Sequence, residues 1–386
     1  LAVWICRRRG LLEGLLGAVV FSFSFVLVLY GSEARGYSSL LFFSLLCFAL
    51  FESYRERPSL NLALCFWTSA LLALLSHFTF LHFYAALLVW SFLLWRREGK
   101  PTGRDWVFLH GVPIVLSLMS LGILFTKLQI AGGPQGSRLE VLINALSVPY
   151  GGTELSLANL DAGVLSLGLA ALLFCILLGE VIRQIRAGQS EGWFYLLMVI
   201  LVPLVLLVLL RPEVFVLRYV LLSIFFGYFV FIQFLAHLLR RDMVGRILAG
   251  VLLGAFILGN ANLLGKLLSY GRGQYSEALK FIAKNSLQDE IIIGSDQDFR
   301  NSLLVAYYAP RAATGKSFRY RGAQFPNPTE ATWVITHTQD PFEVPQPVLS
   351  ESGLTLAAVF ESAPLSGFRW FVYCKESQCP AVVSVN

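Results

Sequence analysis

The stretch YVLLSIFFGYFVFIQFLAHLL, residues 219–239, decides the class of this protein. It contains no Asp, Glu, Lys or Arg, and it has the length of about 20 residues that an apolar helix needs to cross a bilayer. Of the 386 residues of the chain, 56% are hydrophobic and 14% are charged, which excludes a water-soluble enzyme for most of the length. We therefore predict a polytopic α-helical membrane protein. Eight further apolar blocks raise the expected number of spanning helices to about nine, and they cover residues 11–30, 38–53, 59–75, 79–95, 106–125, 162–178, 193–210 and 247–264.

Basic residues between the apolar blocks indicate how the helices are oriented. The connections 7–9, 54–58, 96–105, 179–192 and 240–246 contain 14 Lys and Arg residues, whereas the alternate connections contain five. Because cytoplasmic connections carry the excess of Lys and Arg, the first set is predicted to be cytoplasmic. The formal net charge of +6 comes entirely from residues before Gly265. These basic residues stand at the ends of apolar blocks, so they indicate orientation in a membrane and no binding of nucleic acid.

The first residues belong to an apolar run that does not begin with Met. Leu1 to Cys6 is too short to span a bilayer, and it stops at Arg7, Arg8 and Arg9. The run also lacks the basic start and the cleavage site of a signal peptide. We interpret it as the tail of a spanning helix, and we expect the sequence to be an N-terminally truncated fragment.

The composition changes after Leu264, where an odd number of crossings places the rest of the chain outside the cytoplasm. Residues 265–386 are predicted to form a small extracytoplasmic α/β domain that follows the transmembrane bundle of residues 1–264. Its expected elements are helices at 275–285 and 299–308 and strands at 291–295, 333–336 and 368–373.

Two of the six cysteines, Cys374 and Cys379, lie in this domain and bracket four residues. An oxidising compartment would allow them to form a disulfide bond, and two free thiols are the alternative. The other four lie in or beside apolar blocks, where Cys packs as a small apolar residue. These four are Cys6, Cys47, Cys65 and Cys175.

Ionised side chains on the predicted outer side are few, and they are informative because a charge near hydrocarbon is costly. The seven-residue connection Gly31–Tyr37 contains Glu33 and Arg35. Both must lie at the membrane surface, where they are available to a phosphate, a metal ion or a sugar hydroxyl. An internal ion pair that closes the connection explains the same spacing equally well.

A second outer group, RPEVFVLRY, covers residues 211–219. Arg218 and Tyr219 open the eighth apolar block from its outer end, against the positive-inside trend. An arginine there can reach a lipid phosphate, although simple snorkelling of the side chain accounts for the position as well. The same two interpretations apply to Arg211 and Glu213.

Two histidines flank the outer turn between the third and fourth blocks. His77 and His82 lie among aromatic residues that are typical of the membrane interface. Because they are five residues apart, they do not share one helical face, which disfavours a metal pair on a single helix. A hydrogen-bonding or proton-handling role is one interpretation, and interfacial packing is the other. The remaining histidines, His110, His237 and His337, are assigned to structure.

The long outer connection 126–161 contains the amphipathic run Arg138 to Leu146. Connections of this length are uncommon in compact proteins unless they are functional. The run is predicted to form a helix along the membrane surface, which either covers a substrate cavity or packs on the bundle.

Three short motifs occur in the same order as in a known family. They are Ser32-Glu-Ala-Arg-Gly-Tyr-Ser38 before an apolar helix, Leu81-His-Phe-Tyr-Ala85 and Leu217-Arg-Tyr-Val220. With their shared outer placement, they resemble the bacterial GT-C membrane glycosyltransferases, which are the protein-mannosyltransferase-like and aminoarabinose-transferase-like enzymes of glycosyltransferase family 39 and its relatives. The segments Trp333-Val-Ile335 and Leu365–Tyr373 are similar to the external domain of that group, so the resemblance spans nearly the whole chain.

The resemblance implies an inverting glycosyltransferase with a GT-C-like bundle in the bacterial cytoplasmic membrane, in contact with membrane lipids. Such enzymes transfer a sugar from a polyprenyl-phosphate carrier to a hydroxyl of a glycan, lipid or protein at the outer face. A divalent metal ion often lies near their site, and Glu33 would hold it here. By position, Glu33 matches the acidic residue of the family's second external loop, and Arg35 and Tyr37 match the residues that accompany it. His82 matches the family's histidine. Arg218 and Tyr219 match the site that binds the carrier phosphate. His77 and Arg211 complete the expected substrate contacts.

The chain departs from the family in one respect. The family's proposed base is an aspartate in the first external loop, which would precede Leu1, and Asp161 is a poor substitute for it. The fragment alone is therefore expected to be inactive and the full-length protein active. Two alternatives stay open: an O-antigen-ligase-like or polymerase-like enzyme of carrier lipids, and a transporter or flippase. A transporter would have charged residues at mid-membrane depth or matching broken helices, and the sequence indicates neither.

Overall fold

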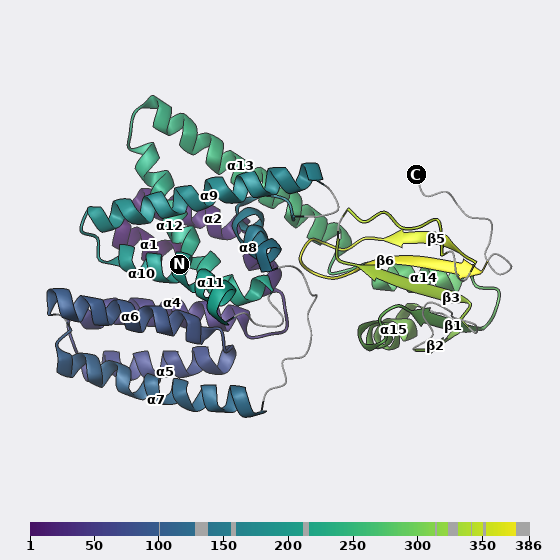
Figure 1. Cartoon of the computed structure of the whole chain (residues 1–386), viewed down its shortest axis with the longest axis horizontal. Coiled ribbons are helices and arrows are strands. Elements are labelled where there is room, and N and C mark those ends of the chain that lie inside the picture. The colour runs from purple at the N-terminus through teal and green to yellow at the C-terminus, as the bar shows by residue number, and fades with distance from the viewer. Residues whose placement is uncertain are drawn as a thin grey trace. The chain divides into compact units, whose positions relative to one another are not determined.

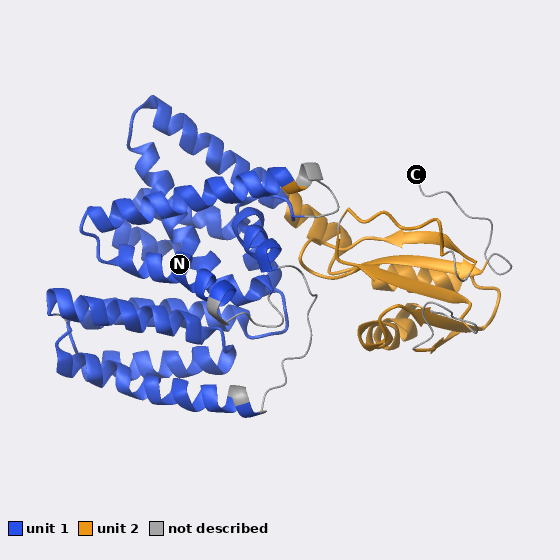
Figure 2. Cartoon of the chain, in the orientation of Figure 1, with its two compact units in different colours: residues 1–155, 164–261 blue, residues 156–163, 262–386 orange. Residues whose placement is uncertain are grey.

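The computed structural model of the chain describes residues 1–99, 101–127, 138–155, 160–210, 216–312, 315–322, 331–340, 342–349 and 353–375. The chain divides into two compact units (Figure 2). The first unit comprises residues 1–155 and 164–261, and the second comprises residues 156–163 and 262–386.

Helices make up the first unit (Figure 1). The apolar blocks fold as helices because a backbone in hydrocarbon satisfies its hydrogen bonds within its own segment. In chain order the helices are α1 (Ala2–Arg9), α2 (Leu11–Phe23), α3 (Phe25–Gly31), α4 (Tyr37–Glu56), α5 (Leu60–Ser76), α6 (Phe80–Glu98), α7 (Gly103–Lys127), α8 (Arg138–Ser147), α9 (Leu160–Arg186), α10 (Glu191–Tyr195), α11 (Val202–Val205), α12 (Leu221–Leu239) and α13 (Met243–Tyr270). Between them lie the 3₁₀ turns η1 (Val148–Tyr150) and η4 (Leu217–Val220) and the π-helical turns η2 (Leu196–Leu201) and η3 (Leu206–Leu210).

Six helices of the described residues are long and apolar enough to cross a membrane, and the bent pair α2–α3 would make a seventh. This number fits a multi-pass membrane protein, but it is lower than the nine spans expected from the sequence. The block 59–75 folds as α5, whose 17 residues extend about 26 Å and fall short of a hydrocarbon core of about 30 Å. The block 79–95 folds as α6, in which His82, Arg96 and Arg97 lower the apolar character.

Helix α12 lies at the centre of the first unit. In the window Leu217–Leu239, 83% of the residues are buried, against 22–44% in the other five candidate spans. The ring of Phe226 lies 5.5 Å from that of Phe83 and 5.0 Å from that of Phe194, so α12 packs against α6 and α10. A helix that is apolar on all sides is buried in this way. The apolar stretch 219–239 therefore forms the core of the bundle.

The break between α2 and α3 is held by side chains of two distant helices. The two helices are bent by 58°, whereas the sequence predicted one continuous block. The backbone N–H of Phe25 donates to Oδ1 of Asn260 at 2.9 Å, and the hydroxyl groups of Ser24 and Tyr228 are 2.8 Å apart. The Tyr228 hydroxyl also donates to the carbonyl of Pro149 at 3.1 Å. The backbone group released by the break is therefore paired inside the protein, as irregular backbone at membrane depth requires.

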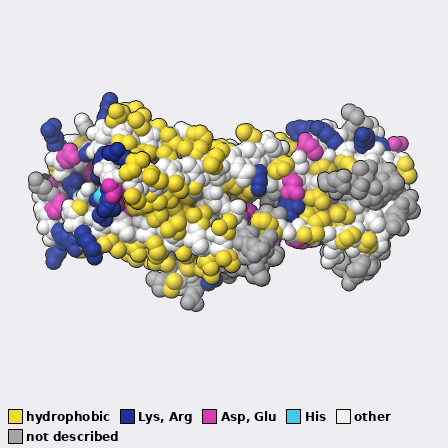
Figure 3. All heavy atoms as spheres, turned by 90° about the horizontal axis from the view of Figure 1, so that it is seen from above, with side chains coloured by type: hydrophobic (Ala, Val, Ile, Leu, Met, Phe, Trp, Pro, Cys, Tyr) yellow, Lys and Arg dark blue, Asp and Glu magenta, His cyan; other side chains and the backbone are white. Residues whose placement is uncertain are grey.

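The basic connections meet at one end of the first unit. Figure 3 shows Lys and Arg side chains gathered at that end, beyond the hydrophobic surface that covers the middle of the helices. These are the connections that the sequence assigned to one common side. Ion pairs join them to each other and to the start of α2, and these pairs are Arg8–Glu56 at 3.0 Å, Arg9–Glu191 at 2.8 Å and Arg240–Glu13 at 2.6 Å.

The second unit is a six-stranded sheet in the order β2-β1-β3-β6-β5-β4. Strands β2, β1 and β3 are parallel, and the other neighbours are antiparallel. Buried residues of two helices pack on the same face of the sheet, together with Trp333 and Ile335, while Val334 belongs to the cluster on the opposite face. The elements are α14 (Tyr275–Asn285), β1 (Glu290–Ser295), α15 (Asp298–Ala312), β2 (Ser317–Tyr320), β3 (Trp333–Thr338), β4 (Val348–Leu349), β5 (Leu354–Phe360) and β6 (Arg369–Lys375).

The two helices and three strands expected in this part of the chain are confirmed as α14, α15, β1, β3 and β6. Strands β2, β4 and β5 were not predicted. Strand β5 contains Ala357 and Ala358, which have a low preference for strands, and β4 is only two residues long. Cys374 in β6 forms a disulfide bond, and Cys379 lies outside the described residues. The four cysteines of the helical blocks are free.

Candidate functional site

Three segments that are far apart in sequence bring the predicted site residues to one end of the first unit. They are the connection after α3, the turn between α5 and α6, and the turn η4 before α12. We call these residues the arginine–histidine cluster. Its members are Glu33, Arg35, Tyr37, His77, His82, Arg218 and Tyr219, whereas the predicted contact residue Arg211 lies outside the described part of the chain.

Gly36 fixes the first of these segments against the second. A Cβ added at Gly36 would lie 2.2 Å from the carbonyl oxygen of Ser76, the last residue of α5. Only glycine allows two backbones to approach so closely. The connection that carries Glu33 and Arg35 therefore lies directly on the turn that carries His77.

Glu33 and Arg35 form a weak contact. The Nε atom of Arg35 lies 3.8 Å from Oε2 of Glu33, and the Arg35 side chain is 58% exposed. An exposed pair at this distance contributes little to stability. The pKa of Arg35 is raised, first by a hydrogen bond to the side chain of Tyr37 and also by the negative charge of Glu33. The internal ion pair that the sequence allowed is thus present, and it leaves Arg35 charged and accessible.

His77 uses one ring nitrogen inside the cluster. Its Nδ1 accepts from the backbone N–H of Thr79 at 3.2 Å and lies 2.9 Å from the Thr79 hydroxyl. The ring lies 4.9 Å from the buried ring of Tyr37. Burial lowers the pKa of His77 to about 4, and the positive charges of Arg218 and Arg35 and the nearby His82 contribute to the shift. His77 is therefore neutral at neutral pH, and its Nε2 carries the proton.

Acidification should destabilise the protein through His77. Its pKa lies below the ordinary value of 6.5, so the unfolded chain binds more protons than the folded one between pH 6.5 and about 4. The stabilisation is complete above pH 6.5, and a loss on the order of 2 kcal/mol is expected as the pH falls toward 4. The measurement is the unfolding temperature of purified protein at pH 7 and pH 4.5. His77→Gln should reduce the difference between the two values, and an unchanged difference would contradict the assignment.

His82 contacts the turn η4 directly. Its ring hydrogen-bonds the backbone of Tyr219, and its buried Nδ1 has no hydrogen-bond partner among the residues that the structure describes. A buried polar atom without a partner is uncommon, so it marks a position where a substrate atom or a water molecule could bind. His82 fits a hydrogen-bonding role better than pure packing.

The charges of Arg218 and Glu33 both influence Tyr30. The guanidinium of Arg218 lies 5.9 Å from the ring of Tyr219, and within the described ranges no carboxylate pairs with it. Tyr30 is within electrostatic range of both Arg218 and Glu33, and His77 is within range of Arg218 and Arg35. The cluster therefore contains two arginines: Arg35 has a long contact of 3.8 Å with Glu33, and Arg218 has no carboxylate partner among the described residues.

The described residues do not by themselves form a metal site. No three His, Cys, Asp or Glu side chains of this part of the chain come together in a way that could hold a metal ion. Glu33 therefore belongs to no such group among the described residues, and the expected divalent ion stays a prediction.

Helix α8 covers a small apolar cavity of about 50 Å³. The amphipathic run predicted from Arg138 to Leu146 folds as this helix, and its Leu142, Ala145 and Leu146 form part of the cavity wall. Val220, two residues after Arg218, lines the same cavity. The helix therefore covers a cavity and packs on the bundle at once.

A second polar region, which the sequence did not predict, lies at the other end of the unit. Arg8, Arg9, Glu13, Glu52 and Glu191 line one cavity there. The positive-inside rule already explains the two arginines, and no role was predicted for Glu13 and Glu52 near the ends of apolar blocks. A carboxylate inside an apolar block was the signal that could have revealed this region.

The chain matches no protein-family model, and neither the curated proteins nor the solved structures include a significant match. The geometry of the described residues is therefore the basis of the functional argument.

Proposed function

We propose that the protein is a GT-C-type glycosyltransferase that moves a sugar from a polyprenyl-phosphate donor to a hydroxyl acceptor, with inversion at the anomeric carbon. The observation that carries the proposal is the arginine–histidine cluster. Three separate segments bring two arginines, two histidines and one glutamate together at one end of an apolar helical bundle. A donor with a phosphate at the membrane surface and an apolar tail needs such a combination.

Arg218 is the proposed ligand of the carrier phosphate. When the bond between the anomeric carbon and the phosphate oxygen breaks, negative charge grows on the phosphate, and a fixed guanidinium stabilises it. Arg218 suits this role because no described carboxylate competes for it. Val220, two residues after Arg218, lines the apolar cavity under α8, and part of the carrier chain can lie there.

Glu33 is the proposed group that orients the acceptor. It is the acidic residue of the cluster, and its side chain is 17% exposed. A carboxylate accepts a hydrogen bond from the attacking hydroxyl and fixes its direction, which is a large part of the advantage of a bound acceptor. His82 can hold a second sugar hydroxyl through its unpartnered Nδ1. The base that removes the acceptor proton is not assigned to this chain.

The test is release of polyprenyl phosphate by membranes that contain the full-length protein. The donors are a panel of polyprenyl-phosphate-linked hexoses and pentoses, and mass spectrometry detects the freed carrier. At least one donor should release its carrier in the presence of an acceptor extract, and Glu33→Ala should remove this release while the protein remains in the membrane. No release from any donor, or wild-type release by the variant, would refute the proposal.

A transporter or flippase is the second candidate, and two observations favour it. The sequence indicated no broken span, but α2 and α3 form one with a bend of 58°. Glu13 and Glu52, near the ends of apolar blocks, are also buried. Broken helices and buried carboxylates are typical of transport sites. Movement of a labelled carrier lipid across vesicles without bond cleavage would support this candidate over the transferase.

A further inference from the structure

A cavity of about 110 Å³ lies between α1, α2, α4, α10 and α12, and we call it the charged cavity. Helix α4 connects it to the arginine–histidine cluster, since Tyr37 begins α4 and Glu52 lies about 22 Å further along the helix at 1.5 Å per residue. The two regions are therefore at opposite ends of the bundle. The polar side chains of the wall are Arg8, Arg9, Glu13, Glu52, Glu191 and Gln233, next to aromatic residues.

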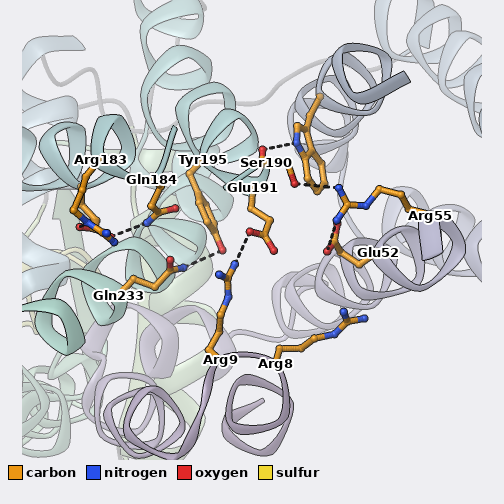
Figure 4. Close-up of polar contacts among 12 residues, drawn as sticks. Arg8, Arg9, Glu52, Arg55, Arg183, Gln184, Ser190, Glu191, Tyr195 and Gln233 are labelled. Atoms are coloured by element: carbon orange, nitrogen blue, oxygen red, sulfur yellow. Dashed lines mark hydrogen bonds and ion pairs between the residues drawn. The ribbon is translucent and has the colours of Figure 1, made fainter. Parts of the chain in front are cut away.

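Ion pairs hold most of the charges around this cavity (Figure 4). Arg9 lies 2.8 Å from a carboxylate oxygen of Glu191. Arg55 lies 3.4 Å from Oε2 of Glu52 and donates to the Ser190 hydroxyl at 3.0 Å. Figure 4 shows the carboxyl groups of Glu52 and Glu191 directed toward the same space, which Arg9 enters from α1. These pairs fix the positions of the wall residues.

One carboxylate oxygen of the cavity wall accepts no hydrogen bond from the described residues. Glu52 is 5% exposed, and its Oε1 is buried without a hydrogen-bond partner among the described residues. Burial of a carboxylate oxygen without a donor is costly, because the atom loses its water and gains nothing in return. A cavity with this volume has room for more than one water molecule. The cavity and the unpartnered oxygen together point to a ligand that brings its own N–H or O–H donor.

The charges around the cavity specify more of this ligand. Among the described residues, Arg8 pairs with the carboxylate of Glu56 and Arg9 with that of Glu191, although a guanidinium has five N–H donors. Both arginines can therefore also bind an anionic oxygen. A simple anion would be repelled by Glu52, and a simple cation by the two arginines. A zwitterion with an ammonium group and a phosphate satisfies both sides.

We propose that the charged cavity binds phosphoethanolamine, presented as the headgroup of phosphatidylethanolamine. The ammonium donates to Oε1 of Glu52, and the phosphate accepts from Arg8 and Arg9. The basic connections that form this end of the bundle are the ones the sequence assigns to a single membrane surface, where lipid headgroups lie. The proposal does not depend on the proposed glycosyltransferase activity.

The test compares lipids that share a phosphate but differ in the amine. Purified protein in detergent is titrated with phosphatidylethanolamine, phosphatidylcholine and phosphatidylglycerol, and native mass spectrometry counts the bound lipid. Phosphatidylethanolamine should bind at least tenfold more tightly than phosphatidylcholine, whose quaternary ammonium has no N–H to donate to Glu52. Equal binding of the two lipids would overturn the proposal. Soluble glycerophosphoethanolamine is the second arm, and its competition at similar concentration would show that the headgroup alone is the ligand.

Two variants locate the site. Glu52→Gln keeps the size of the side chain but removes the charge that attracts the ammonium, so the preference for phosphatidylethanolamine should disappear. Glu56→Gln is the matched control, because Glu56 lies on the same helix, contacts Arg8 and does not line the cavity. The control should retain the preference. Loss in both variants or in neither would overturn the assignment, and unfolding temperatures check that each variant is folded.

Discussion

Arg218→Ala in the full-length protein should lower the release of polyprenyl phosphate at least a hundredfold. In the proposed reaction Arg218 is a fixed positive charge where the leaving phosphate becomes more negative, and the removal of such a charge typically lowers a rate about 10²- to 10³-fold. The fold should persist, since Arg218 is partly exposed and no described carboxylate depends on it. The measurement is the initial rate of carrier release by purified protein, with whichever donor of the panel gives release with the wild type.

Arg97→Ala is the matched control for this experiment. Arg97 is also an arginine at the end of a helix, but it belongs to the last turn of α6, where it lies 4.5 Å from the ring of Trp193. Its removal should leave the rate within about twofold. Arg218→Lys should keep part of the rate, because a lysine retains the charge but loses the planar fork of donors. Equal rates for wild type and Arg218→Ala would remove Arg218 from the site.

Gly259→Ala should strongly destabilise the helical unit. A Cβ added at Gly259 would lie 2.0 Å from the carbonyl oxygen of Gly151 and 2.5 Å from its Cα, both of which are backbone atoms. Gly151 has a φ of +93°, so this turn has little freedom to move away. The turn includes Pro149, whose carbonyl accepts hydrogen bonds from the side chains of Tyr228 and Asn260. A shift here would therefore also disturb the break between α2 and α3. We expect a cost of about 3 kcal/mol.

The measurement is the unfolding temperature in detergent, which should fall by roughly 5–10 °C. Gly254→Ala is the control on the same helix, where an added Cβ meets no atom of the described residues within 4 Å. It should leave the unfolding temperature within about 1 °C. Similar behaviour of the two variants would show that the close approach of α13 to the turn at Gly151 is not a feature of the protein in solution.

The apolar blocks of the sequence predict most helices, because hydrocarbon leaves the backbone no other arrangement. The same rule does not give the number of spans. Leu60–Ser76 is short by a few residues, and the polar residues of Phe80–Glu98 lower its apolar character. The bend at Ser24 was also beyond prediction, since it depends on Asn260 and Tyr228, more than 200 residues away.

The candidate site was partly accessible from the sequence. The positions of Glu33, His77 and Arg218 in connections of the same predicted side imply that they share one end of the bundle. Only the structure shows that Gly36 lies on Ser76 and that the ring of His82 contacts the turn before α12. The sequence did not predict the charged cavity. The positive-inside rule already explains Arg8 and Arg9, so nothing in their positions indicates the carboxylate partners that the structure shows.

We propose that a phosphate-bearing lipid carrier binds at the arginine–histidine cluster. Photolabelling of the purified protein tests this binding, with a polyprenyl phosphate that carries a diazirine on its first isoprene unit, followed by peptide mapping. Labels should fall within residues 31–37, 77–82 and 216–220, and Arg218→Ala should remove them. Labelling of the segments around Glu52 and Glu191 instead, or labelling of the cluster that Arg218→Ala does not change, would contradict the claim.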